Sequence, residues 1–103
     1  MTNKEKLLNA IGLAIRANQV VYGQRLLEKI TKDQVYVVII ADDMGTTQKK
    51  KLLNKASFYK IEVLDELISK PELNKLLNKD KEFEISAIGI TDKNLANLIK
   101  SYE

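Results

Sequence analysis

The chain has 103 residues, of which 45% are hydrophobic and 30% charged, a composition typical of one globular domain spanning residues 1–103. Cysteine and histidine are absent, which excludes disulfides, thiolate metal sites, cysteine nucleophiles and a histidine general base. The net charge of +3 is unevenly distributed along the chain. Residues 1–60 carry eleven basic and five acidic side chains, whereas residues 61–103 carry six basic and nine acidic ones. We therefore expect phosphate contacts in the first part.

The first elements are a helix and a short strand. Thr2 or Asn3 can cap a helix whose apolar positions recur near a 3.6-residue period. Asn18 suits the left-handed position just past the end of this helix. Residues 20–22 then form a short extended segment.

A second helix, a buried strand and a third helix follow. Gly23 opens a helix that ends near Lys32. Residues 35–40 are a mostly β-branched apolar run, which is typical of a strand covered on both faces. Thr46 or Thr47 is expected to cap the next helix, which reaches about residue 59.

The last part of the chain repeats the alternation. Residues 61–64 and 85–90 read as strands, and the segment 72–77 reads as a short helix because Pro71 suits a first turn and Ser69 or Lys70 precedes it. Asp92 is expected to cap a final helix that reaches about residue 99. Because helices and strands alternate with short connections, we expect a three-layer α/β/α sandwich with a mixed sheet of about four strands.

Targeting signals are not visible in the sequence. No stretch approaches the roughly 20 apolar residues of a membrane span. The N-terminal residues lack the apolar core of a signal peptide, so we expect a cytoplasmic protein.

The start of the second helix has the features of a phosphate site. Gly23 places backbone N–H groups and the positive end of a helix dipole beside Arg25 and Lys29, which lie one helical turn apart. A guanidinium can fork onto phosphate or guanine, and the amine can follow the backbone. The purely structural alternative is that Gly23 only starts a helix. Gln24 can equally contribute a polar contact or face solvent.

Two further groups of charged residues have plainer interpretations. The lysines at 49, 50, 51 and 55 are expected to form a solvated helix face that adds salt-sensitive phosphate attraction. Asp42 and Asp43 follow a buried strand, where magnesium ligands can gather. Since no glycine-rich phosphate loop completes such a site, we expect these carboxylates to turn the loop and to accept hydrogen bonds from backbone N–H groups.

Several local motifs, in this order, resemble a known family over nearly the whole chain. The chain is similar to the ribosomal protein superfamily of the L-seven-Ae and L-thirty-e type, and particularly to its short bacterial YlxQ-like branch. The matching pieces are Gly12-Leu13-Ala14 with Arg16-Ala17, Val20-Val21-Tyr22-Gly23, residues 37–43, Lys49-Lys50-Lys51-Leu52, Leu73 and residues 87–93. The resemblance implies a three-layer fold and binding of structured RNA, often a kink-turn, within ribosomal or ribonucleoprotein particles.

The family motif at the second helix is matched in part. Gly23, Arg25 and Lys29 correspond to its glycine, polar or basic residue and lysine, whereas Leu26 stands where the family has a Glu or Gln that contacts base edges. A leucine has no donor or acceptor, so direct readout is weakened. Asn74 and Asn78 stand at two glycine positions, and the segment 79–83 stands where the family has a small apolar loop.

The sequence and the resemblance together predict a non-enzymatic protein that binds structured RNA, with ribosomal RNA as partner, ribosomal proteins as possible neighbours and a monomer when free. No cofactor, metal ligand or catalytic residue is assigned. The alternative is a protein-interaction module that kept the fold but lost RNA specificity, and an exposed Leu26 would favour it. A magnesium-dependent enzyme that uses the two aspartates is the third hypothesis. The expected RNA-binding residues are Gly23, Gln24, Arg25, Lys29, Lys32, Asp42, Lys79, Asp80 and Lys81.

Overall fold

A computed structural model describes residues 2–65, 67–78 and 85–102 of the chain. Helices and strands alternate along it as expected. No helix within these residues combines the length and the apolar run that crossing a bilayer requires. The helices are α1 (Asn3–Arg16), α2 (Gln24–Thr31), α3 (Thr46–Phe58), α4 (Lys70–Leu77) and α5 (Lys93–Lys100), and the strands are β1 (Val20–Tyr22), β2 (Val37–Ile40), β3 (Glu62–Asp65) and β4 (Ala87–Ile90).

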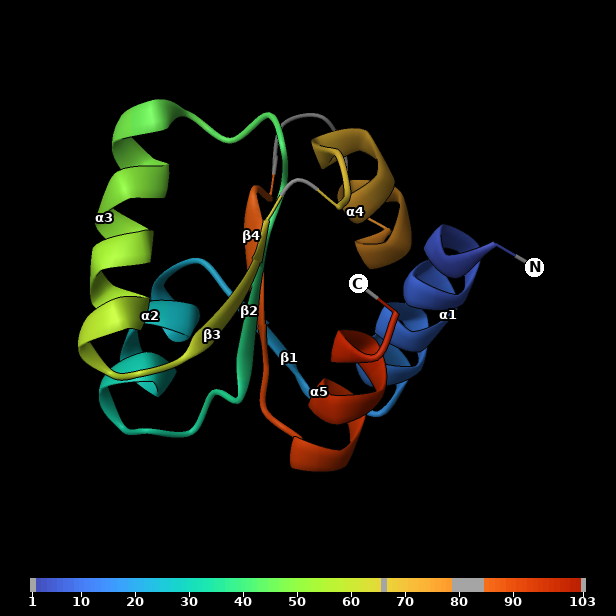
Figure 1. The fold of residues 1–103 in the computed structure, drawn as a ribbon, viewed down its shortest axis with the longest axis horizontal. Coiled ribbons are helices and arrows are strands. Elements are labelled where there is room, and N and C mark those ends of the chain that lie inside the picture. The colour runs from blue at the N-terminus through green and yellow to red at the C-terminus, as the bar shows by residue number, and fades with distance from the viewer. Residues whose placement is uncertain (1, 66, 79–84, 103) are drawn as a thin grey trace.

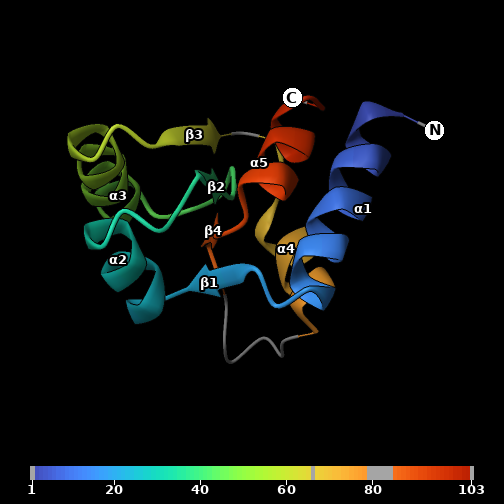
Figure 2. The ribbon, with the colours of Figure 1, turned by 90° about the horizontal axis from the view of Figure 1, so that it is seen from below.

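The four strands form one mixed sheet in the order β1-β4-β2-β3. β2 and β3 are parallel, with Val37 beside Glu62, whereas β4 is antiparallel to both of its neighbours, β1 and β2. Helices α1, α4 and α5 cover one face of the sheet, and α2 and α3 cover the other (Figures 1 and 2). The predicted three-layer sandwich with a four-stranded mixed sheet is therefore confirmed.

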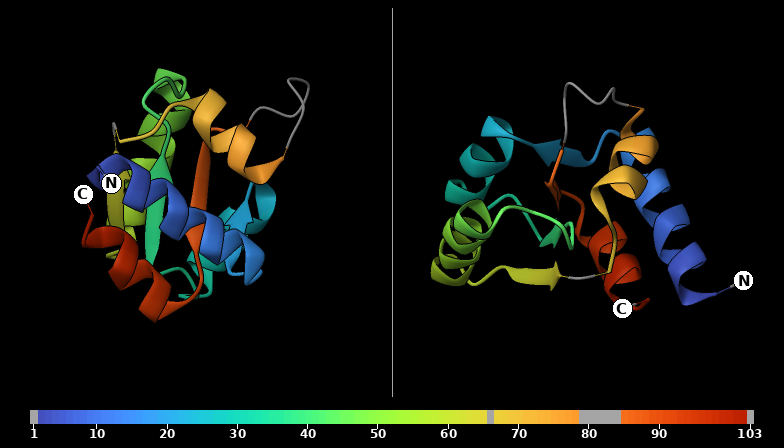
Figure 3. Two further views of the ribbon diagram at one scale, coloured as in Figure 1. Left: turned by 90° about the vertical axis from the view of Figure 1, so that its right-hand side faces the viewer. Right: turned by 90° about the horizontal axis from the view of Figure 1, so that it is seen from above.

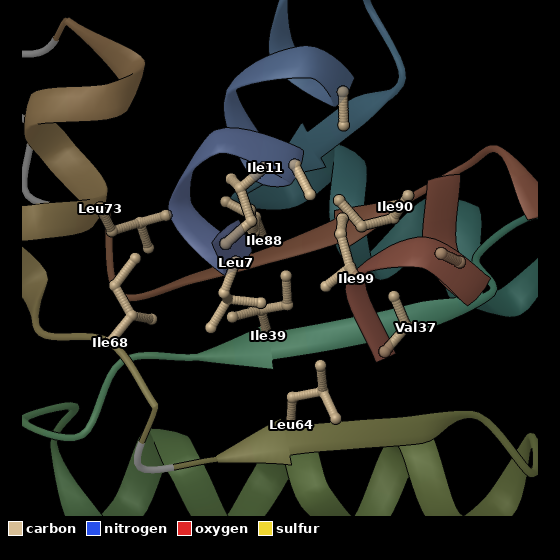
Figure 4. Packing of buried hydrophobic residues seen from close by; sticks show 13 residues of the cluster. Leu7, Ile11, Val37, Ile39, Leu64, Ile68, Leu73, Ile88, Ile90 and Ile99 are labelled. Carbon is tan, nitrogen blue, oxygen red and sulfur yellow. The ribbon is translucent and has the colours of Figure 1, made fainter. Parts of the chain in front are cut away.

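Each face of the sheet has its own apolar core. On the α1, α4 and α5 face, Ile39 and Ile88 point from the central strands toward Leu7 and Ile11 of α1, as Figure 4 shows. Alternate residues of the same strands, such as Val38 and Ile40, pack with α2 and α3 on the opposite face. All four residues of β2 are fully buried, which confirms the prediction of a strand covered on both faces.

The caps predicted at Thr2 and Asp92 are confirmed, and α4 begins at Lys70, two residues before its predicted start, with Ser69 as its cap. Thr2 and Ser69 each form a capping box with the glutamate three residues later, and the Asp92 side chain accepts a hydrogen bond from the N–H of Leu95. Neither Thr46 nor Thr47 caps α3, because both already lie in its first turn. The cap is Gly45, whose carbonyl accepts the hydrogen bond from the N–H of Lys49 at 2.9 Å.

Strand boundaries differ from the predicted ones by one or two residues. The segment predicted to begin at Val35 becomes a strand only at Val37, although the N–H of Tyr36 already donates to the carbonyl of Ile90 at 2.9 Å. Val35 is nonetheless buried, since it packs against the sheet with α2. Burial of an apolar residue therefore extends beyond the hydrogen-bonded strand.

Candidate nucleic-acid interface

One end of the sheet gathers the segments that the sequence marked for binding. β1, β2 and β3 all end there and β4 begins there, because β4 is antiparallel to β1 and β2. The start of α2, the loop 42–45 and residues 85–86 consequently share this edge. Figure 3 shows the link from β2 to α3 in two views.

The start of α2 depends on an unusual backbone conformation at Gly23. Its φ of 62° and ψ of −137° lie in a region that side-chain-bearing residues rarely adopt. A Cβ added here would meet nothing within 4 Å, so the requirement for glycine comes from the backbone and not from crowding. No side chain caps this helix end among the described residues, and Gly23 and Gln24 are exposed. The free N–H groups and the helix dipole therefore face solvent.

Three cations follow one flank of α2. Arg25, Lys29 and Lys32 are spaced at i, i+4 and i+7, which places them in one row along the helix. Arg25 and Lys32 are exposed, and the ammonium of Lys29 donates to the Gln34 side-chain oxygen at 3.0 Å. Arg25 and Lys29 are brought together in one hollow, as their spacing predicts.

That hollow lies between α2 and the edge strand β1 and has a volume of about 430 Å³. Its lining is largely polar and includes one exposed aromatic ring, Tyr36, which the sequence analysis left unassigned. The hydroxyl of Thr91 donates to the Gln19 side-chain oxygen at 2.8 Å and fixes this amide at the rim. The lining residues are Asn18, Gln19, Val20, Val21, Arg25, Lys29, Asp33, Gln34, Tyr36 and Thr91.

An apolar groove of about 520 Å³ lies on the opposite flank of α2, between it and α3. Gly23, Leu27 and Leu52 line the groove, and so do Lys51 and Lys55 of α3. These two lysines were predicted to lie on a solvated face, and the sequence did not predict the groove. Their i, i+4 spacing was the available signal that they share one side of α3.

Leu26 lines the apolar groove from beneath α2, with only 3% of its surface exposed. The Leu26 side chain packs directly over Gly89 of β4. A Cβ at Gly89 would lie 2.5 Å from Leu26 Cδ1 and 3.0 Å from Val35 Cγ1. Leu26 is therefore an anchor of α2 on the sheet, and its burial leaves the choice between an RNA binder and a protein-interaction module open.

The two aspartates after β2 serve the loop that contains them. The Asp43 carboxylate accepts a hydrogen bond from the N–H of Lys70 at 2.8 Å, and the N–H of Asp42 donates to the carbonyl of Ile68 at 2.8 Å. The predicted bracing of backbone N–H groups is thus confirmed for Asp43. In the described part of the chain, no cluster of three or more Asp or Glu side chains is arranged to hold a metal ion.

Asn74 of α4 braces the chain at Ile85, just before β4. The buried Asn74 side chain donates to the carbonyls of Lys70 at 2.8 Å and Ile85 at 3.0 Å, and it accepts a hydrogen bond from the N–H of Ile85 at 2.8 Å. Asn78 ends α4 in the left-handed region with φ of 59°, which asparagine tolerates better than most residues. The predicted contacts Lys79, Asp80 and Lys81 lie outside the described residues.

One lysine of the predicted solvated face has a structural partner. The ammonium of Lys49 lies 2.6 Å from the carboxylate of Asp65, which joins α3 to the end of β3. Lys50 is exposed, whereas Lys51 and Lys55 line the apolar groove. The four lysines therefore do not form one uniform surface.

The chain resembles known proteins over almost its full length, although no model of a known protein family matches it. The RNA-binding protein YlxQ of Enterococcus faecium is 31% identical over 99 residues, which cover 95% of this chain and 91% of that protein. A solved structure of a protein with unknown function from Bacillus halodurans C has a TM-score of 0.85 at 31% identity, covering 94% of this chain and 95% of that one. The Giardia lamblia 15.5kD RNA binding protein shares the fold, with a TM-score of 0.77 at 17% identity over 97% of this chain and 83% of that one.

Proposed function

Because this chain belongs to the family of the RNA-binding protein YlxQ, within the ribosomal protein superfamily of the L-seven-Ae and L-thirty-e type, we propose that it binds structured RNA through the start of α2. Gly23 and Gln24 form that start, where uncapped N–H groups and the helix dipole attract a phosphate. Asp42 takes part indirectly by shaping the neighbouring loop. Lys79, Asp80 and Lys81 are further proposed RNA contacts on the evidence of the sequence alone.

The observation that carries this proposal is the distribution of cations on both flanks of α2. Arg25, Lys29 and Lys32 follow one flank, and Lys51 and Lys55 face the groove on the other. A phosphate backbone that passes over the exposed side of α2 meets positive charge on either side. Such contacts position an RNA and make its binding sensitive to salt without reading its sequence.

Base recognition in this proposal depends on Arg25. The family's Glu or Gln is replaced by Leu26, which is 3% exposed and cannot reach a base. Arg25 is exposed at the first turn of α2, and its guanidinium can donate two parallel hydrogen bonds to a guanine edge or a phosphate. We propose that kink-turn-like RNA is recognised by its shape, its backbone and this one side chain.

The proposed target is ribosomal RNA, with neighbouring ribosomal proteins as further contacts in an assembled particle. The protein acts without catalysis, in the cytoplasm, and is monomeric when free. These points rest on the family resemblance and on the solvent-exposed cations of α2.

A second candidate function is a protein-interaction module. The observation that favours it is the apolar groove between α2 and α3, where Leu27 is 38% exposed. An amphipathic segment of a partner protein could lay its apolar side chains into such a groove. RNA binding remains the leading proposal because cations flank the helix on both sides.

A titration with three RNAs tests the proposal. A kink-turn RNA, a straight duplex of the same length and bulk ribosomal RNA are each titrated at low and near-physiological salt. Arg25→Ala and Arg25→Lys are compared with Lys93→Ala, which removes an exposed charge from α5 on the opposite layer. Salt-resistant preference for the kinked RNA that is lost in Arg25→Ala supports the proposal. Weak binding to all three RNAs that vanishes with salt and ignores Arg25 refutes it and favours the protein-interaction module.

A further inference from the structure

The polar hollow beside α2 combines a concave shape with cations at one end and a carboxylate at the other. Contact with the phosphate backbone of a duplex would require neither feature. The lining of the hollow comes from α2, from the edge strand β1 and from the residues next to them. Figure 2 shows β1 at the edge of the sheet, where it pairs only with β4 among the described strands. Arg25 lies at one end, beside the start of the helix, and Asp33 and Tyr36 lie beyond its other end. The helix rises about 10 Å between these ends, which is the scale of one to two nucleotides.

The Arg25 end suits a phosphate. Its guanidinium and the ammonium of Lys29 are one helical turn apart and both line the hollow. Gln34 holds the Lys29 ammonium by the 3.0 Å hydrogen bond, so this cation has a defined position. The Asp33 carboxylate would repel a phosphate at the opposite end, and the charges therefore orient an anion toward Arg25.

The Tyr36 end suits a base. Tyr36 is 45% exposed between the buried residues Val35 and Val37, so its ring stands outward from a fixed part of the core. Its N–H is tied to the carbonyl of Ile90 at 2.9 Å, which holds the backbone beneath the ring in place. An exposed aromatic ring anchored in this way is a stacking platform for an unpaired base, and stacking of this kind tolerates any base.

Polar groups for the edge of a base stand nearby. The Gln19 oxygen already accepts the hydroxyl proton of Thr91 at 2.8 Å, which leaves the Gln19 amide nitrogen free to donate. The Asp33 carboxylate can accept from an amino group of a base. Cation, aromatic ring and amide together match a nucleotide better than an extended peptide, which would need apolar side-chain pockets.

We propose that this hollow binds one unpaired nucleotide that flanks the structured RNA, with its phosphate on Arg25 and Lys29 and its base stacked on Tyr36. The inference rests on the proposed function, since it adds a single-stranded contact to the same interface. Tyr36 thereby becomes a binding residue for RNA ends or bulges.

The experiment compares a blunt kink-turn RNA with the same RNA carrying three unpaired nucleotides at each end, titrated by fluorescence anisotropy at near-physiological salt. We expect the unpaired ends to tighten binding of the wild-type chain by about tenfold. Tyr36→Ala removes this gain without changing binding of the blunt RNA, and Tyr36→Phe keeps it. Phe58→Ala is the matched control, because Phe58 is the most exposed aromatic residue of the described chain at 79% and lies at the end of α3, outside the hollow. Arg25→Ala weakens binding of both RNAs.

Three results would overturn the inference: equal binding of the two RNAs by the wild-type chain, a gain that survives Tyr36→Ala, or an equal loss in Phe58→Ala. Binding of neither RNA by the wild-type chain would instead refute the proposed function, and this inference with it. Far-ultraviolet circular dichroism confirms that each variant is folded, which we expect because both aromatic rings are exposed.

Discussion

The contact between Leu26 and Gly89 predicts that two stability losses are not additive. In Gly89→Ala the new Cβ would stand 2.5 Å from Leu26 Cδ1 and 3.0 Å from Val35 Cγ1, so the leucine must move inside a packed core. We expect this change to cost about 1–3 kcal/mol. Leu26→Ala removes a side chain that is 3% exposed and should cost about 2–5 kcal/mol through lost burial and a residual cavity.

The double variant separates this packing explanation from a general loss of stability. With alanine at position 26 the closest obstacle to the new Cβ is gone, so Gly89→Ala should then cost about 1–2 kcal/mol less than it does in the wild-type background. Urea unfolding at 25 °C measures the free energy of unfolding, with unchanged slopes as the check on two-state behaviour. Gly45→Ala is the control, because its Cβ would meet nothing closer than 4.0 Å and its φ is −57°. Costs that add within error would refute the view that Leu26 is seated on Gly89.

Four further substitutions probe the binding end of the molecule and its surroundings. Gly23→Ala should cost about 1–3 kcal/mol in urea unfolding despite the open space around it, because φ of 62° strains any side chain, and an unchanged midpoint would contradict this. Arg25→Ala should weaken binding of kink-turn RNA by about 1–3 kcal/mol. Lys49→Ala should act weakly and mainly through salt dependence, because the Lys49 ammonium pairs with the Asp65 carboxylate. Equal small losses from the two substitutions would argue against α2 as the recognition element. The hydrogen bond from Lys4 and those at the cap of α4 lower the pKa of Glu72 below its ordinary 4.5, so its stabilisation is complete above pH 4.5 and is lost as the pH falls through the lowered pKa. The stability difference between wild type and Glu72→Gln should therefore shrink in acid, and a difference that stays constant from neutral pH to pH 2 would contradict this.

Much of the architecture can be predicted from local patterns in the sequence. The apolar run before Asp42 predicts a strand buried on both faces, and Ser69 followed by Pro71 predicts the start of α4, because these signals act over a few residues. Local sequence signals do not predict features that depend on residues distant in sequence but close in space. The cap of α3 at Gly45 instead of a threonine depends on how the chain leaves β2.

The candidate site is less predictable for the same reason. The row of Arg25 and Lys29 follows from helical spacing, and the structure places both in one hollow. The burial of Leu26 depends on a glycine 63 positions later in the sequence, and the groove that Lys51 lines needs the packing of α3 beside α2. Tyr36 could not be singled out because nothing near it in sequence indicates that it shares a hollow with residues of β1 and α2.

The Asn74 side chain fixes the entry of β4 from a helix that precedes it in the chain. The Asn74 amide forms hydrogen bonds with both the N–H and the carbonyl of Ile85, as a neighbouring strand would. Asn74 belongs to α4, whose start is capped by Ser69. The anchors on each side of residues 79–84 are therefore set by groups that do not belong to those residues. Because this brace comes from α4, the place where the chain enters β4 is set without any group from residues 79–84.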